Sequence, residues 1–189
     1  MLEFNLVSAP PLAGYDQRFD GVNLTAPTDL AIVSLALPLG GEAAAEKSVK
    51  AAYGAALPGI GKSALSKDGS ARLVRLSPDA AFVIFTHTTP DAEPFVAKKI
   101  KGAAYTTDQT DVWTGLEIAG PRARTALERI CPIDLHPASF ATGDAARTTM
   151  EHLGTLIIRT GDDAFLLLSG SSSAKSFLHA IETSIHNTA

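Results

Sequence analysis

The sequence predicts an α+β domain made of two similar βαββα halves, with antiparallel sheets whose helices pack on one face. Two observations support this prediction. Each half shows a strand pattern, a helix pattern, two or more strand patterns and a closing helix pattern. The halves also share a short phrase, since residues 79–84 align with residues 162–167. One such layer buries only one face of its sheet, so the two halves are expected to pack together.

The first residues of the chain show little periodicity and contain prolines. Residues 1–29 are therefore expected to form an extended N-terminal arm, with one edge strand at residues 2–7. Residues 30–189 are expected to form a single domain built of two halves, at about residues 30–107 and 108–189.

The first half alternates apolar runs with helical patterns. A short apolar run before Pro38 is typical of a strand, and Val49 and Tyr53 lie on one face of an Ala-rich helix. Thr89 and Pro90 fit the N-cap and first position of a second helix. The expected elements are a strand at 31–37, a helix at 42–57, a loop at 62–70, a hairpin of strands 72–76 and 81–86, a helix ending near 101, and a strand at 103–107.

The second half repeats this order. Gly120 and Pro121 open a helix that turns Ala123, Ala126 and Leu127 to one face. An irregular connector with two prolines follows this helix. The expected elements are a strand at 113–118, the helix from 120, the connector at 131–140, strands at 145–150, 155–159 and 164–168, and a closing helix at 173–186.

The composition is that of a globular chain with a small negative charge. Of the 189 residues, 46% are hydrophobic and 19% are charged, which excludes a disordered chain. The net charge is −4 and there is no basic block, so nucleic acid is not expected as a partner. No apolar run approaches the roughly 20 residues of a membrane span, so a membrane is not expected either. The mean hydropathy of +0.13 is high, as it would be if a partner covered part of the surface.

The single cysteine, Cys131, excludes an internal disulfide and fits a reducing compartment. The first eight residues lack the basic region of a signal peptide and carry Glu3 within their apolar run. A cytoplasmic protein is therefore expected.

Gly59-Ile60-Gly61-Lys62-Ser63 resembles the end of a phosphate-binding P-loop. The full motif needs a glycine five positions before Gly61, where this chain has Ala56. The motif should also follow a strand, whereas here a helix pattern precedes it. A turn that ends the helix is the better interpretation.

Cys131, Asp134 and His136 bring a thiol, a carboxylate and an imidazole close together in the sequence. A zinc site needs three or four ligands, and the other histidines show no metal-ligand spacing. Cys131 directly follows an apolar helix face, where cysteine behaves as a small hydrophobic residue. We therefore predict no catalytic, cofactor-binding or metal-binding residue in this chain.

Residues 120–127, and residues 131–140 with the run Cys-Pro-Ile-Asp-Leu-His-Pro-Ala-Ser-Phe, closely resemble the gamma subunit of heterotetrameric sarcosine oxidase. Leu76-Ser77-Pro78-Asp79 is similar to a Leu-Gly-Pro-Asp stretch of the same family. The resemblance covers about residues 30–186. Because the gamma family is similar to the folate-binding domain of aminomethyltransferases, the resemblance implies ferredoxin-like halves in this chain.

The resemblance also implies a function. The complete enzyme oxidises the N-methyl group of sarcosine and yields glycine, hydrogen peroxide and a one-carbon unit that tetrahydrofolate can accept. This chain would be its non-catalytic gamma subunit, with alpha, beta and delta subunits as partners. FAD, FMN, NAD and tetrahydrofolate are expected in the partner subunits, and no cofactor is expected in this chain.

Four residues are candidates for the contact with those partners: Trp113, Leu135, His136 and Phe140. Aromatic and apolar anchors concentrate at the centres of interfaces, although the same residues would also suit a core. The alternative function is that of a stand-alone folate-binding or aminomethyltransferase-like protein. That protein would need a pocket with an acidic residue for the pterin ring and a base near the reacting nitrogen.

Overall fold

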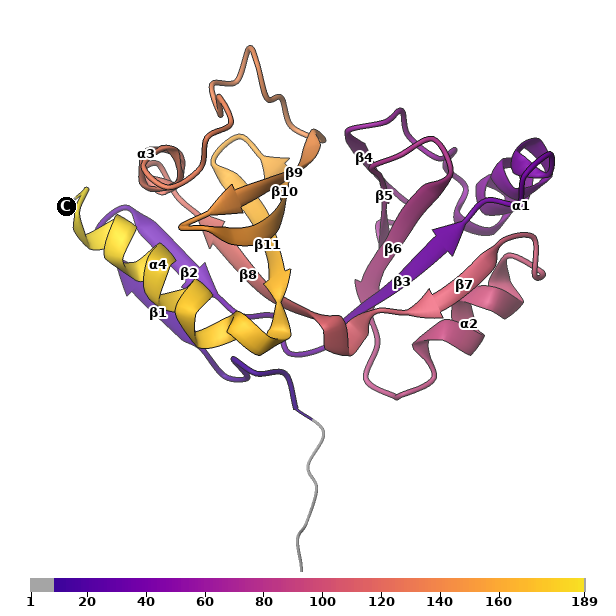
Figure 1. Cartoon of the computed structure of the whole chain (residues 1–189), viewed down its shortest axis with the longest axis horizontal. Helices are drawn as coiled ribbons and strands as arrows, with labels where there is room; N and C mark the ends of the chain where they lie inside the picture. The colour runs from indigo at the N-terminus through magenta and orange to yellow at the C-terminus, as the bar shows by residue number, and fades with distance from the viewer. Residues whose placement is uncertain (1–8, 189) are drawn as a thin grey trace, which may run out of the picture.

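The structure is a computed structural model that describes residues 9–188, and it consists of four layers in the order helix, sheet, sheet, helix (Figure 1). Each half contributes one antiparallel sheet with helices on its outer face, and the inner faces of the two sheets pack together. The predicted α+β class and the packing of the two halves are therefore confirmed. The edge strand expected at residues 2–7 lies outside the described residues.

The first half forms a five-stranded sheet in the order β4-β5-β6-β3-β7. Gly54, with a φ of 65°, ends α1 earlier than expected, because a left-handed glycine terminates a helix. The segment expected as a loop contains β4, a short strand that pairs with β5. Its polar residues give no strand pattern in the sequence. The elements are β3 (Leu30–Ala36), α1 (Glu42–Tyr53), β4 (Lys62–Leu65), β5 (Ala71–Arg75), β6 (Ala80–Thr86), α2 (Ala92–Lys99) and β7 (Tyr105–Asp108).

Helix α2 begins later than the sequence suggests. Asp91, and not Thr89, occupies the N-cap position, and the Thr89 hydroxyl donates a hydrogen bond to the Asp91 carboxylate. This hydrogen bond and one with His87 hold the pKa of Asp91 below its usual range. Pro94 is tolerated within the first turn of the helix because the amide groups there need no intrahelical partner.

The second half supplies four strands of a six-stranded sheet in the order β1-β2-β8-β11-β10-β9, and the N-terminal segment supplies the other two. Part of the expected N-terminal arm is a hairpin of β1 (Asp16–Phe19) and β2 (Val22–Thr25), which extends this sheet along β8. None of the helices within residues 9–188 combines the length and the apolar composition needed to span a membrane. The other elements are η1 (Thr110–Val112), β8 (Trp113–Ala119), α3 (Ala123–Glu128), β9 (Ala145–Met150), β10 (Leu153–Gly161), β11 (Ala164–Gly170), η2 (Ser171–Ser173) and α4 (Ala174–His186).

The two sheets repeat one topology. The spatial order β9-β10-β11-β8-β2 of one sheet matches β4-β5-β6-β3-β7 of the other, although β2 precedes its four neighbours in the chain and β7 follows its own. The pairing registers place Ala80 and Ala164 at equivalent positions, one residue away from the alignment of the shared phrase. As a result, Phe82 packs between the sheets whereas Phe165 packs under the helices, because a one-residue shift turns a side chain to the opposite face. The two halves therefore correspond in their strand order, and the sequence match between residues 79–84 and 162–167 does not align structurally equivalent positions.

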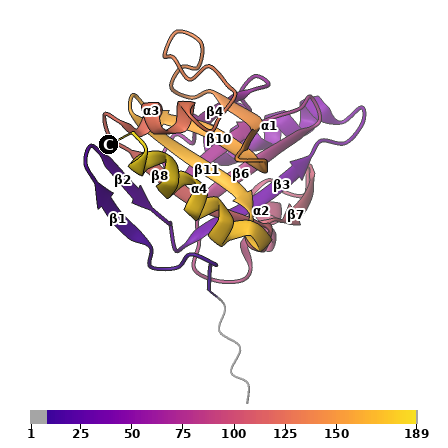
Figure 2. The ribbon, with the colours of Figure 1, turned by 60° about the vertical axis from the view of Figure 1, so that its left-hand side comes forward.

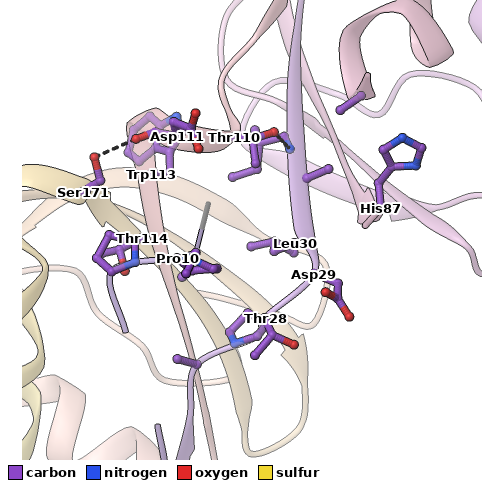
Figure 3. Close-up of a pocket in the computed structure, with 18 of the residues that line it drawn as sticks. Pro10, Thr28, Asp29, Leu30, His87, Thr110, Asp111, Trp113, Thr114 and Ser171 are labelled. Atoms are coloured by element: carbon purple, nitrogen blue, oxygen red, sulfur yellow. Dashed lines mark hydrogen bonds between the residues drawn. The ribbon is translucent and has the colours of Figure 1, made fainter. Parts of the chain in front are cut away.

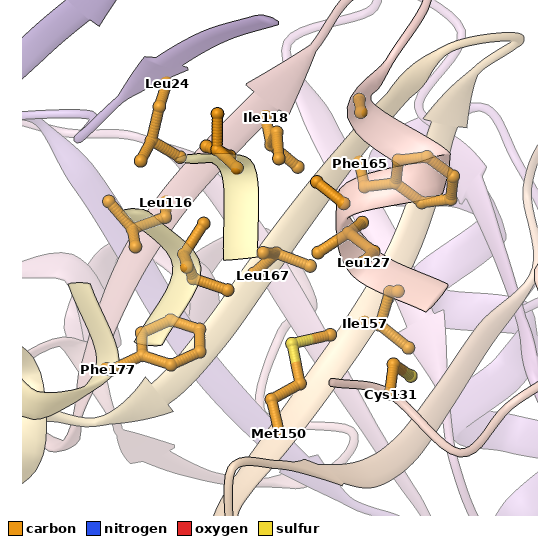
Figure 4. Close-up of a cluster of buried hydrophobic side chains, with 14 of the residues drawn as sticks. Leu24, Leu116, Ile118, Leu127, Cys131, Met150, Ile157, Phe165, Leu167 and Phe177 are labelled. Atoms are coloured by element: carbon orange, nitrogen blue, oxygen red, sulfur yellow. The ribbon is translucent and has the colours of Figure 1, made fainter. Parts of the chain in front are cut away.

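Three apolar clusters hold the layers together. The cluster of the second half lies between its sheet and the helices α3 and α4 and includes Leu127, Phe165 and Phe177 (Figure 4). A corresponding cluster of the first half lies under α1 and α2. The third lies between the sheets, where Ile32 and Ile84 of the first half meet residues of the second half such as Leu156. Burial of apolar surface on both faces of each sheet explains the high mean hydropathy without requiring a partner.

The two sheets are also joined along one edge by polar contacts. Strand β4 of the first half and the start of β9 meet there, where the Ser63 amide donates to the Gly143 carbonyl oxygen and the Ala145 amide donates to the Gly61 carbonyl oxygen, at 2.5 and 2.9 Å. Lys62 Nζ lies 2.5 Å from Oδ1 of Asp144, whose side chain is 13% exposed. The four layers therefore form one connected unit, and Figure 2 shows the two sheets one behind the other.

Tyr53 at the end of α1 gives a first testable prediction. Its hydroxyl is buried and has no hydrogen-bond partner among residues 9–188, and burial raises the pKa of Tyr53 to about 12. Replacing Tyr53 by Phe removes an unsatisfied polar group, so we expect the free energy of unfolding at neutral pH to stay equal or to rise by up to about 1 kcal/mol.

The pH dependence of the same variant is also predicted. An unfolded tyrosine releases its proton near pH 10, at about its ordinary pKa, whereas folded Tyr53 keeps the proton until about pH 12. The wild-type free energy of unfolding therefore falls as the pH rises through this window, and the Tyr53→Phe variant loses this part of the decline. Urea unfolding at neutral pH and at about pH 11 tests both effects. Tyr105→Phe, at a residue that is 72% exposed, is the control, and a steeper alkaline decline in Tyr53→Phe would contradict the prediction.

Candidate functional site

The connector between α3 and β9 carries three of the four predicted contact residues. Leu135 and Phe140 point inward and are 0% and 5% exposed. Arg159 of β10, which is only 3% exposed, binds the connector from the protein interior. Its Nη1 donates to the carbonyl oxygens of Leu135 and Phe140, at 3.3 and 2.8 Å. Its Nε donates to the carbonyl oxygen of Gly161 at 3.2 Å, and its Nη2 donates to the carbonyl oxygen of Asp162.

The outer face of the connector is polar and locally ordered. The His136 amide donates to Asp134 Oδ1 at 2.9 Å, and the Ala138 amide donates to His136 Nδ1 at 3.3 Å. Because Nδ1 accepts, the neutral imidazole carries its proton on Nε2. A hydrogen bond from Ser139 and the bond from the His136 amide keep the pKa of Asp134 below its usual range. The connector therefore presents an ionised carboxylate and an exposed imidazole on a loop of defined shape.

The predicted contact residues divide into two groups. Leu135 and Phe140 belong to the core of the second half, together with Cys131, so they cannot anchor a partner while the chain is folded. This corrects the expectation for both residues, because the alternation of inward and outward side chains in an irregular segment is not visible in its sequence. His136 is exposed and remains available to a partner.

Trp113 lies where the two halves meet, at the start of β8. Its ring packs edge-on against Phe82, with ring centroids 6.0 Å apart. Its indole Nε1 is buried without a hydrogen-bond partner in the part of the chain that the structure describes. Trp113 is partly exposed, and because it packs against the cluster between the sheets it serves mainly as a contact between them.

A groove of about 640 Å³ opens beside Trp113 at the junction of the halves (Figure 3). Asp29, Asp108 and Asp111 line it, and the residues that line it include no lysine or arginine. His87 also lines the groove, but its Nε2 lies 2.8 Å from Asp91 Oδ1 and its ring packs beside two phenylalanines. The groove is thus acidic, and the imidazole of His87 is already paired with Asp91.

The motifs that resembled chemical sites have structural roles. The Gly61, Lys62 and Ser63 amides donate to backbone carbonyl oxygens, so they are not free to cradle a phosphate. Cys131 is 6% exposed, and its Sγ lies 3.9 Å from Thr148 Oγ1. Within residues 9–188, no group of three or more histidine, cysteine or acidic side chains is placed to hold a metal ion.

The sequence did not predict the roles of two residues, Arg159 and Asp144, that hold distant segments together. Arg159 looked like the polar end of a strand, yet it is buried and binds four carbonyl oxygens. The available signal was its place directly after the apolar residues Leu156–Ile158 of β10, because a cationic side chain that is buried with them needs hydrogen-bond acceptors. Asp144, which pairs with Lys62 across the two halves, gave no comparable signal, because the contact joins residues that are 82 positions apart.

Comparison with known proteins reveals sequence relatives of one kind. The chain is 31% identical over 129 residues to sarcosine oxidase subunit gamma of Corynebacterium sp. (strain P-1), which covers 68% of this chain and 63% of the relative. It is also 31% identical over 126 residues to sarcosine oxidase subunit gamma of Arthrobacter sp., covering 66% of this chain and 62% of the relative. The chain thus matches less than two thirds of the length of either relative. No model of a known protein family matches the chain.

Solved structures share the fold. A chain of the heterotetrameric sarcosine oxidase from Corynebacterium sp. U-96 in complex with pyrrole 2-carboxylate superposes with a TM-score of 0.75 at 23% identity, covering 88% of this chain and 84% of that one. Aminomethyltransferase T of the glycine cleavage system from Bartonella henselae superposes with a TM-score of 0.60 at 15% identity, covering 85% of this chain and 45% of that one. These superpositions concern the fold, and they confirm the predicted aminomethyltransferase-like architecture. The sequence relatives confirm the resemblance found in residues 120–140.

Proposed function

We propose that this chain, which is related to sarcosine oxidase gamma subunits, is itself the gamma-type subunit of a heterotetrameric, flavin-dependent sarcosine oxidase. The observation that carries the proposal is the identity of 31% over 129 residues with a sarcosine oxidase gamma subunit. In this role the chain supports assembly with the larger subunits and supplies no catalytic residue. The engaged backbone amides of residues 61–63 and the buried thiol of Cys131 agree with a role outside the chemistry.

The proposed complex contains alpha, beta and delta subunits in addition to this chain. Those partners would hold FAD, FMN, NAD and tetrahydrofolate, and the complex would work in the cytoplasm. It would oxidise the N-methyl group of sarcosine to give glycine, hydrogen peroxide and a one-carbon unit for tetrahydrofolate. His136 on the outer face of the connector and the exposed edge of Trp113 are the remaining candidates for partner contact.

Affinity purification of the tagged chain from its native cells tests the proposal directly. We expect large flavoprotein subunits to co-purify, identified by mass spectrometry and by the flavin absorbance band. A mock purification from untagged cells is the control. A colourless chain that purifies without partners would contradict the proposal. Calorimetry with a folate on that free chain would then test the folate-binding alternative, for which saturable micromolar binding is the expected result.

A further inference from the structure

The repeated topology of the two halves identifies a vacant strand position. In the second half the strand next to β8 is β2, and β1 pairs with the outer edge of β2. In the first half the equivalent neighbour of β3 is β7. No strand within residues 9–188 pairs with the outer edge of β7. β7 is thus one of the two edge strands of its sheet, as Figure 1 shows, and no strand within residues 9–188 takes the position there that β1 fills in the other half.

The hydrogen-bond pattern identifies which groups of β7 face outward. The Gln109 amide donates to the Ile32 carbonyl oxygen, which makes these two residues a bonded pair at the end of the β3–β7 ladder. Bonded and non-bonded pairs alternate in an antiparallel ladder, so the backbone groups of Tyr105 and Thr107 also point toward β3. The amides and carbonyls of Thr106 and Asp108 therefore point away from the sheet.

The surroundings of β7 leave this edge accessible. Thr107 and Asp108 are exposed and Tyr105 is 72% exposed. The strand contains no proline, lysine or bulge, which are features that commonly protect a free edge from pairing. Of the two outward positions of β7, only Asp108 is charged, whereas both outward positions of β1, Asp16 and Arg18, are charged.

We propose that β7 accepts an additional antiparallel strand donated by a large subunit of the proposed sarcosine oxidase complex. This inference rests on the proposed function and assigns one contact within it. Extended segments bind to open sheet edges through main-chain hydrogen bonds, and neighbouring side chains give specificity. The arriving strand would pair with the Thr106 and Asp108 backbone as β1 pairs with β2, and it would cover Tyr105. A donated strand satisfies outward amides and carbonyls that a helix or a flat apolar surface would leave unpaired.

Three variants of the full chain, co-expressed with the partner subunits, separate the backbone contact from other effects. Thr106→Pro removes one outward amide without removing a bond of the β3–β7 ladder, and we expect at least about tenfold weaker assembly. Thr106→Val keeps the amide but loses the hydroxyl that donates to Glu93, so assembly should stay within about twofold of wild type. Arg18→Pro removes an outward amide of β1 in the same way and should also assemble within about twofold.

Hydrogen exchange on the wild-type chain provides a readout that does not depend on any variant folding. We expect the Thr106 and Asp108 amides to exchange rapidly in the free chain and to be protected in the purified complex. A complex that forms without this protection would overturn the edge inference and leave the proposed function standing. Absence of any complex would overturn both. Protection of β7 in a dimer of the free chain would replace the partner strand by a second copy and would also overturn the inference.

Discussion

Leu135→Asp is expected to leave most of the chain unfolded, whereas the same substitution at the neighbouring His136 should leave it folded. Leu135 is fully buried in the core of the second half, and His136 is exposed on the connector. Loss of a buried leucine costs about 2–5 kcal/mol, and burial of a carboxylate adds several kcal/mol more. The sum approaches the whole stability of an ordinary domain, which is about 5–15 kcal/mol.

Far-UV circular dichroism and urea unfolding of the two purified variants test this prediction. We expect the free energy of unfolding of His136→Asp to stay within about 0.5 kcal/mol of wild type. A folded Leu135→Asp variant would show that the connector is not held in the core as described. The folded His136→Asp variant then tests the partner surface, because weaker co-purification of the large subunits would support a contact at His136. Unchanged co-purification would remove His136 from the candidates.

Arg159→Met is expected to lower the free energy of unfolding by about 3 kcal/mol or more. The variant keeps most of the side-chain volume but leaves the carbonyl oxygens that Arg159 binds without their donor. Each buried acceptor without a donor costs about 1–3 kcal/mol, and partial access of water to the loop reduces the total. Arg147→Met is the matched control, because Arg147 is exposed on the neighbouring strand β9 and its replacement should cost less than about 0.5 kcal/mol.

Urea unfolding followed by fluorescence measures this difference. The chain has one tryptophan, Trp113, which lies between the two sheets and reports on their separation. Limited proteolysis supplies a second measurement, since release of the connector should expose residues 131–140 to cleavage before the rest of the chain unfolds. Equal stability of Arg159→Met and Arg147→Met would show that the buried guanidinium does not hold the connector.

Most elements of the fold are predictable from local patterns because their sequences are strongly apolar and periodic. The strands 31–37, 81–86 and 164–168 are apolar runs between turn residues, and all three agree with β3, β6 and β11 to within two residues at each end. The closing helix expected at 173–186 agrees with α4 for the same reason. The short strands β1, β2 and β4 were not predicted, because their polar residues carry little signal and only pairing with a neighbour makes them strands.

The candidate site shows the same division. The residues of the connector, Cys-Pro-Ile-Asp-Leu-His-Pro, were sufficient to indicate the relationship with gamma subunits, which the sequence relatives confirm. The sequence could not show that Leu135 faces inward while His136 faces outward, since an irregular segment has no period from which to read direction. The role of Arg159 depends on carbonyl oxygens of four residues in two separate segments.

The fold class, the two halves and the family resemblance can be predicted from the residues, because apolar periodicity, turn residues and a distinctive motif are local properties of the chain. Only the folded structure shows which residues of the connector are core and which are surface, where the two sheets meet, and that no strand within residues 9–188 pairs with the outer edge of β7. These features depend on contacts between distant segments, such as Lys62 with Asp144, and on the register of strand pairing. No local pattern encodes them, since a strand that pairs on both edges and a strand that pairs on one can have the same sequence.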